Sequence, residues 1–194
     1  MIGLRETVRA DLDALLRSQE LYNDASSSPQ VWKTLLTNIG FQQLAVYRLA
    51  SWCAGHRLVP IAMVIGRLMR HLYDADMHYA SDIEPGVVVV HGNGLVISRT
   101  SSVGAGCILS QQVTLGVSRI RGRPDGSPRL DHDVHVGPGA VLVGPITVGA
   151  HTKVAPNVFV SGDVEPWTVI TPAPANHSPS RDRPAEVGTL GRSG

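Results

Sequence analysis

The sequence predicts an α+β protein, a helical segment followed by a parallel β-solenoid, and two observations support this prediction. The first is a change of composition near Ser81: residues 1–80 hold 12 Leu and 5 Val, whereas residues 81–194 hold 6 Leu, 19 Val, 16 Gly and 11 Pro. Leucine favours helices, and β-branched valine favours extended backbone. The second is a six-residue repeat within the valine-rich part. We therefore expect a helical domain over 1–80, a β-solenoid over 81–176 and a disordered tail over 177–194.

Four helices are expected in the first part. An apolar stripe at helical spacing predicts the first of them (Leu4, Val8, Leu12, Leu15 and Leu16). Pro29, directly after Ser28, is typical of a first helical turn and opens a second helix that runs to about Leu36. Gly40 is expected to separate that helix from a third over 41–53, and a fourth should cover roughly 60–73.

The repeat places one aliphatic residue at every sixth position, in two unbroken runs. These anchors are Ile97, Val103, Leu109 and Leu115, then Leu130, Val136, Leu142, Val148, Val154 and Val160. In a solenoid, such residues fill the interior, and three hexads close one triangular coil whose backbone groups pair with the next. The alternative is a β-sandwich, which would show strict alternation and irregular turn spacing instead.

Composition also excludes several classes of partner. The 17 basic and 16 acidic residues give a net charge of +1, so we expect neither a nucleic-acid partner nor electrostatic attachment to a membrane. The longest apolar stretch, 58–69, is too short to span a bilayer, and the first residues lack the apolar region of a signal peptide. Cys53 and Cys107 offer neither a disulfide framework nor a metal-binding spacing. A cytoplasmic location is expected.

Several motifs point to one family. They are Asp82-Ile83-Glu84-Pro85, His91-Gly92-Asn93-Gly94-Leu95-Val96-Ile97, Gln112-Val113-Thr114-Leu115-Gly116, Val136-Gly137-Pro138-Gly139-Ala140 and Val164-Glu165-Pro166, with Gly40-Phe41-Gln42, Tyr47-Arg48 and Trp52 before them. Over roughly 5–175, the chain resembles the hexapeptide-repeat acyltransferases, and within them the serine acetyltransferases. The resemblance implies a left-handed parallel β-helix and acetyl transfer from acetyl-CoA to a small-molecule hydroxyl. It also implies a homotrimer with active sites between barrels, in which trimers could further pair.

The resemblance assigns His91 as the general base and Asp82 as the carboxylate that orients its ring. Imidazole suits this role because its ordinary pKa lies close to neutral pH. The repeat singles out His91 as well, because it stands six residues before Ile97, where the other hexads carry an aliphatic anchor. The alternatives are a hydrogen-bonded structural histidine and, for Asp82, a turn-capping residue. Asp82 stands nine residues before His91, one hexad fewer than in the family.

The resemblance also implies where the two substrates bind. The residues expected at the coenzyme are Gly116, Arg119, Arg121, Gly137, Pro138, Ala155 and Pro156, and those expected at the acceptor are Asp24 and Arg129. The interruption over 117–129 should form a loop whose arginines, with Arg123 among them, would meet the phosphates of coenzyme A or an anionic acceptor. A solvated loop without a ligand is the alternative reading of this segment.

The acceptor positions depart from the family. Val90 replaces an acidic residue before the catalytic histidine, and Gly126-Ser127 replace an Arg-His pair. Since those groups bind the amino-acid acceptor in the family, a sugar or natural-product hydroxyl is an alternative acceptor. A non-catalytic scaffold is the alternative from another class, because Pro138 and Pro156 cannot donate an N–H to the coenzyme.

No metal is expected from the sequence. His132, His135 and His151 do not reproduce the three-histidine spacing of the zinc-binding β-helix enzymes, and the neighbouring carboxylates Asp131 and Asp133 form no obvious ligand set with them.

Overall fold

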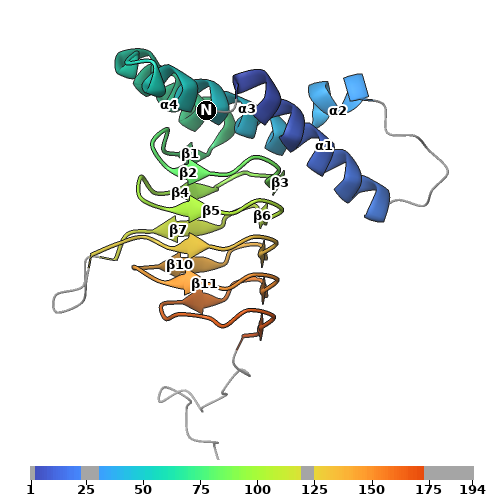
Figure 1. Ribbon diagram of the computed structural model, residues 1–194, viewed down its shortest axis with the longest axis vertical. Helices are drawn as coiled ribbons and strands as arrows, with labels where there is room; N and C mark the ends of the chain where they lie inside the picture. The colour runs from blue at the N-terminus through green and yellow to red at the C-terminus, as the bar shows by residue number, and fades with distance from the viewer. Residues whose placement is uncertain (1–2, 23–30, 119–124, 173–194) are drawn as a thin grey trace, which may run out of the picture.

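The computed structural model describes residues 3–22, 31–118 and 125–172, and it shows a layer of helices across one end of a triangular β-solenoid (Figure 1). The helices are α1 (Leu4–Tyr22), α2 (Val31–Thr37), α3 (Ile39–Gly55) and α4 (Val59–Tyr73). Among the described residues, none of the helices is long and apolar enough to cross a membrane. The predicted class, helices followed by a left-handed parallel β-helix, is confirmed.

The solenoid consists of short strands that form three parallel sheets. The strands are β1 (Asp76–Met77), β2 (Asp82–Ile83), β3 (Val88–Val90), β4 (Val96–Ile97), β5 (Ser102–Val103), β6 (Ile108–Ser110), β7 (Thr114–Gly116), β8 (Arg129–Leu130), β9 (His135–Val136), β10 (Val141–Val143), β11 (Thr147–Val148), β12 (Lys153–Val154), β13 (Phe159–Val160) and β14 (Val169–Ile170). Sheet A has the order β1-β4-β7-β10-β13, sheet B β11-β8-β5-β2 and sheet C β14-β12-β9-β6-β3. The chain therefore visits the three sheets in turn.

The predicted anchors form the core. All ten are at most 6% exposed, and the ladders join anchor to anchor, as in Ile97 opposite Leu115 and Leu115 opposite Leu142. Each interior column is therefore a stack of aliphatic side chains, and burial of this apolar surface is the main stabilising contribution to the solenoid.

The start of the solenoid differs from the prediction. Strand β1 begins at Asp76, before the predicted boundary at Ser81, and the buried anchors continue backward as Ile83 and Met77. The anchor before Ile97 is Val89, which pairs with Leu109. The interval from Val89 to Ile97 is thus eight residues rather than six. His91 lies within this longer turn, so the inference that it occupies an anchor position was wrong.

Gly40 does not end a helix, as the sequence suggested, but lies inside α3. That helix begins one residue after Asn38, whose Oδ1 accepts a hydrogen bond from the Phe41 N–H at 2.8 Å as an N-cap. A Cβ at Gly40 would collide with the backbone carbonyl of Val89. Glycine is therefore required here because α3 packs directly on β3.

A buried ion pair ties the helical layer to the first coil. Arg48 of α3 donates from Nε to Asp11 Oδ2 of α1 at 2.9 Å, and also donates to the carbonyls of Ile83 and Glu84. Asp11 Oδ1 accepts from the Gly86 N–H at 2.8 Å. Burial raises the pKa of the Asp11 carboxyl, and its contacts with Arg48 oppose that shift. One guanidinium and one carboxylate thus join two helices to the coil.

Replacement of Arg48 by Met should destabilise the protein strongly. The change leaves the Asp11 charge and two carbonyls buried without their partner, and loss of one member of a buried pair costs about 3–5 kcal/mol. The free energy of unfolding can be measured by urea denaturation. Arg70→Met is the matched control, because Arg70 forms an exposed pair with Asp76, and exposed pairs contribute about 1 kcal/mol or less. Equal losses in the two variants would contradict this assignment.

Candidate active site

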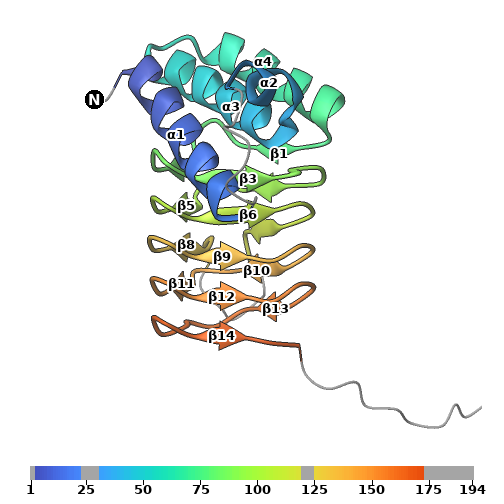
Figure 2. The same cartoon turned by 90° about the vertical axis from the view of Figure 1, so that its right-hand side faces the viewer.

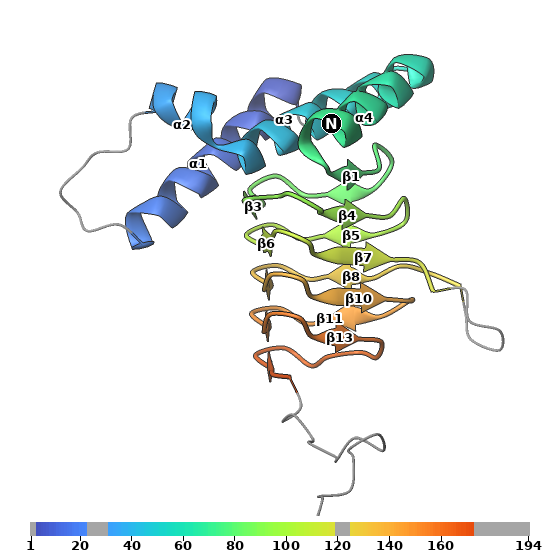
Figure 3. The same cartoon turned by 180° about the vertical axis from the view of Figure 1, so that it is seen from behind.

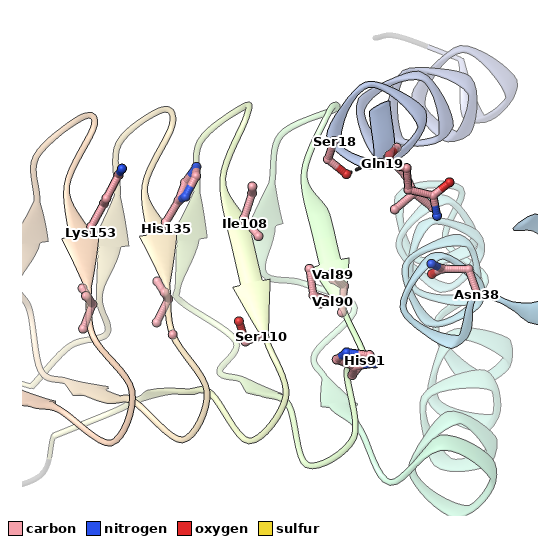
Figure 4. A pocket seen from close by; sticks show the side chains of 14 residues that line it. Ser18, Gln19, Asn38, Val89, Val90, His91, Ile108, Ser110, His135 and Lys153 are labelled. Atoms are coloured by element: carbon pink, nitrogen blue, oxygen red, sulfur yellow. Dashed lines mark hydrogen bonds between the residues drawn. The ribbon is translucent and has the colours of Figure 1, made fainter. Parts of the chain in front are cut away.

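Helix α1 runs across the upper strands of sheet C (Figure 2). The outer face of sheet C and the underside of α1 line a pocket of about 630 Å³ (Figure 4). This volume lies in the range of small-molecule sites. Its lining residues come from α1 (Leu15, Ser18, Gln19), from the N-cap of α3 (Asn38), from β3 and its turn (Val89, Val90, His91), and from the coils below (Ile108, Ser110, His135, Val136, Gly137, Lys153, Val154). The helical layer and the solenoid therefore form this pocket together.

His91 lies at one end of the pocket, in the turn between sheets C and A, which we call the C–A corner. Its backbone is left-handed, with φ at 65°, and its side chain is exposed. The next residue, Gly92, has no room for a Cβ because Gln43 Oε1 of α3 lies against it. Gln43 is fully buried, and its Nε2 donates to the Tyr73 carbonyl at 3.2 Å. The turn is thus held from behind, while the imidazole faces outward.

The structure does not bring Asp82 to His91. Asp82 lies on sheet B, where it pairs with Ser102, and the whole of β3 separates it from the C–A corner. No hydrogen bond or ion pair joins the two side chains within the described ranges. A different aspartate lies on the strand that pairs with the segment after the turn of His91. Asp76 of β1 pairs with Val96, which directly follows that turn, and the Gly94 N–H donates to the Asp74 carbonyl at 2.7 Å.

Asp76 has the separation from His91 along the chain that the family resemblance implies, whereas Asp82 does not. It stands fifteen residues before His91, one hexad more than the nine of Asp82. Its neighbour Met77 is buried, so Asp76 lies on the outer face of sheet A, and its Oδ1 accepts from Arg70 Nη2 at 2.8 Å. The repeated pattern of an aspartate followed by an aliphatic anchor was present in the sequence, but Met77 falls outside the run of anchors recognised there.

Four of the residues predicted at the coenzyme lie along the C–A corner. Gly137 lines the pocket with His91, and Pro138, Ala155 and Pro156 belong to the successive turns of that corner. Backbone hydrogen bonds stack these turns, as between the Asn157 N–H and the Pro138 carbonyl at 2.8 Å.

The other predicted residues lie elsewhere. Gly116 ends β7, the central strand of sheet A, on the side away from the C–A corner, and Arg129 is exposed on β8 of sheet B, so neither lines the pocket. Asp24, Arg119, Arg121 and Arg123 fall outside the described residues. The chain leaves the solenoid between β7 and β8 (Figure 3), where Ser118 and Gly126 form an antiparallel bridge at the base of the excursion.

The sequence did not predict that two basic residues, His135 and Lys153, line the pocket. His135 and Lys153 face each other across the β9–β12 ladder and project from the outer face of sheet C (Figure 4). Burial lowers the pKa of His135, and the charge of Lys153 lowers it further. Each of these residues directly precedes an anchor on sheet C, as Ile108 does. The residue before the sheet C anchor in each coil projects outward on the same face. Comparing this position from coil to coil could have predicted both residues.

Comparison with known proteins shows the family to which the chain belongs. No family model matches the chain. A serine acetyltransferase of Helicobacter pylori is 30% identical over 154 residues, which cover 79% of this chain and 89% of the relative. The chain belongs to the serine acetyltransferase family. A relative from Synechococcus elongatus is 34% identical over 134 residues. The chain spans about half the length of that protein, 54%, and the match covers 68% of this chain.

Solved structures of the family share the fold. Soybean serine acetyltransferase, in complex with serine, has a TM-score of 0.75 at 29% identity, and the match covers 87% of this chain and 68% of the soybean chain. The Neisseria gonorrhoeae enzyme has a TM-score of 0.77 at 24% identity, with 90% and 68% covered. The latter likeness supports the left-handed β-helix alone.

The two thiols of the chain are inaccessible. Cys107 is fully buried in the solenoid and Cys53 is 5% exposed in α3. Cys107 Sγ donates to the Asp131 carbonyl at 3.0 Å, and burial raises the pKa of this thiol to about 12. Since the thiolate is the reactive form, Cys107 is unsuited to nucleophilic catalysis.

We expect neither cysteine of the folded protein to react with Ellman's reagent at neutral pH. Both should react once the chain is unfolded in guanidinium chloride, where burial no longer suppresses the thiolate. Absorbance of the released thionitrobenzoate measures the number of reactive thiols. Rapid labelling of Cys107 in the native protein would contradict its placement in the core.

Proposed function

We propose that the protein transfers the acetyl group of acetyl-CoA to the hydroxyl of serine, with His91 as the general base. Membership of the serine acetyltransferase family supports the reaction. The position of His91 supports its role, because it is a histidine on a backbone-fixed turn at the end of a pocket of suitable volume.

In the proposed mechanism, a nitrogen of the neutral His91 ring accepts the proton of the acceptor hydroxyl while the hydroxyl oxygen attacks the thioester carbonyl. The carbonyl carbon forms a bond to oxygen, and its bond to sulfur then breaks. The resulting imidazolium returns the proton to the thiolate of coenzyme A, so protons balance over one turnover. Support from Gln43 and Gly92 holds the turn in place, which lowers the cost of orienting the base.

The coenzyme is proposed to lie along the C–A corner. Gly137, Pro138, Ala155 and Pro156 lie below His91 at this corner, so a pantetheine arm along it would end at the base. The two prolines offer carbonyls but no N–H groups, so hydrogen bonds to the arm must come from neighbouring residues. Lys153, in the same pocket, supplies positive charge for a phosphate or a carboxylate.

We propose that acceptor contacts at the corner between sheets A and B come from a second chain. Gly126 and Ser127 lie at the corner between sheets A and B, with Arg129 beside them, and sheet A separates that corner from His91. The Ser127 hydroxyl is hydrogen-bonded there to those of Ser98 and Thr100, at 2.8 and 2.6 Å. A site that uses both corners can form only between neighbouring chains, which favours the predicted homotrimer. Contacts of Gly116, Asp24, Arg119 and Arg121 with the substrates, and the pairing of trimers, stay predictions.

We expect the amine and carboxylate of serine to be bound weakly, because two positions of the chain lack charged groups. Val90 lines the pocket beside His91 and offers no charge to an amine. Loss of a bidentate arginine clamp, at Gly126-Ser127, removes a strong carboxylate contact. These two positions are the reason to assay hydroxyl acceptors without the charged groups of an amino acid beside serine.

Turnover should depend on His91. Acetyl-CoA and serine should release free thiol, and His91→Asn should lower kcat by about 10²- to 10⁴-fold, the usual contribution of a general base. Asn tolerates the left-handed backbone of this position, so the fold should be preserved. Thiol release can be followed with Ellman's reagent, with His71→Asn on α4 as the control. Turnover with a sugar or another hydroxyl but not serine would reject serine as acceptor, and full activity of His91→Asn would reject the base.

Two variants decide which carboxylate orients the ring. We propose Asp76, and expect Asp76→Asn to lower kcat by about tenfold or more, whereas Asp82→Asn should change it by less than about threefold. Steady-state kinetics of both variants, with release of free thiol as the readout, test this directly. The reverse order of effects would restore Asp82.

A further inference from the structure

A second cluster of polar side chains lies at the corner between sheets B and C, on the edge of the solenoid opposite to sheet A. It consists of His132, Asp133 and His151. Asp133 and His151 are 18 residues apart, three hexads, and therefore occupy the same position of successive coils. The His151 N–H donates to the His132 carbonyl at 3.2 Å, which fixes the two turns against each other.

The three side chains converge. Asp133 Oδ2 lies 3.0 Å from His132 Nδ1 and 3.7 Å from His151 Nδ1. One nitrogen or oxygen atom from each of the three residues lies within 4.8 Å of the other two. In a tetrahedral zinc site, with metal–ligand bonds of about 2.0–2.2 Å, neighbouring ligand atoms are roughly 3.3 Å apart. The separations of 3.0 and 3.7 Å from Asp133 Oδ2 lie on either side of that value.

The backbone fixes the positions of two of these residues, Asp133 and His151. Asp133 and His151 both have left-handed backbones, with φ at 57° and 59°. The Asp133 N–H donates to the Ala105 carbonyl of the coil above at 2.9 Å, and a Cβ at Gly106 would meet the Asp133 carboxylate. Trp167 stacks on His151 from below, with ring centroids 4.1 Å apart. Two of the ligands are therefore held between neighbours above and below.

We propose that His132, Asp133 and His151 bind one divalent transition-metal ion, zinc, across two coils of the solenoid. Two imidazole nitrogens and one carboxylate oxygen suit zinc, whereas calcium and magnesium prefer oxygen ligands alone. Because His132 and Asp133 are exposed, water can complete the coordination. The expectation of no metal rested on the spacing of the histidines along the chain and on the lack of an obvious ligand set with Asp131 and Asp133. The ligands proposed here meet through the coil repeat instead, while His135 lines the pocket beneath α1.

Zinc titration of the full chain, without an affinity tag and after treatment with EDTA, tests the site. Isothermal calorimetry should show one zinc ion per chain. His151→Asn and Asp133→Asn, both compatible with a left-handed backbone, should weaken zinc binding at least about tenfold. His132→Gln, at a position without positive φ, should do the same. His56→Gln is the matched control, because His56 also packs against a tryptophan, Trp52, with ring centroids 4.2 Å apart.

A spectroscopic readout locates the ion. Nickel, which quenches nearby indole fluorescence, should quench the wild-type protein, and Trp167→Phe should remove that change while zinc affinity is retained. Circular dichroism in EDTA shows whether each variant is folded. Equal zinc affinity in the wild type and the three ligand variants would overturn the proposal. Absence of binding at millimolar zinc would also overturn it, and the cluster would then be a hydrogen-bonded corner without a metal.

Discussion

In-register pairing between successive coils is the constraint on which the rest of the structure depends. Each strand of the solenoid pairs in parallel with the strand one circuit away, so residues at equivalent positions form columns that run along its length. The inward columns must be aliphatic, because a polar side chain buried there without a hydrogen-bond partner would cost stability. The outward columns and the corners are free of that demand. Chemistry is therefore confined to positions that the core does not need.

The corners are suited to chemistry because their backbone is fixed. Non-glycine residues there adopt left-handed conformations, which cost energy and persist only where the surrounding structure enforces them. The C–A corner carries His91 and the proposed coenzyme path, and the opposite edge carries the proposed zinc ligands. The helical layer completes the first of these sites, since the Arg48–Asp11 pair holds α1 in the position where it covers the pocket.

The fold could be predicted from the sequence because its determinant is local: one aliphatic residue in six, repeated. Predictions failed where the repeat is broken or where residues meet across coils. Two extra residues between Val89 and Ile97 moved His91 out of the anchor column, and the spacing alone could not locate them. Considered from the sequence alone, Gly40 suggests the end of a helix. In the structure, glycine is needed at this position of α3 because β3 lies directly against it. Asp133 and His151 meet only because one circuit takes 18 residues.

The central claim is that the C–A corner is the site of acetyl transfer, and a crystal structure with coenzyme A and serine tests it most directly. We expect the pantetheine arm to follow Pro138 and Pro156, with its sulfur beside the serine hydroxyl. That hydroxyl should lie within about 3.2 Å of a ring nitrogen of His91. A coenzyme bound at another corner, or a serine out of reach of His91, would show that acetyl transfer does not take place at the C–A corner.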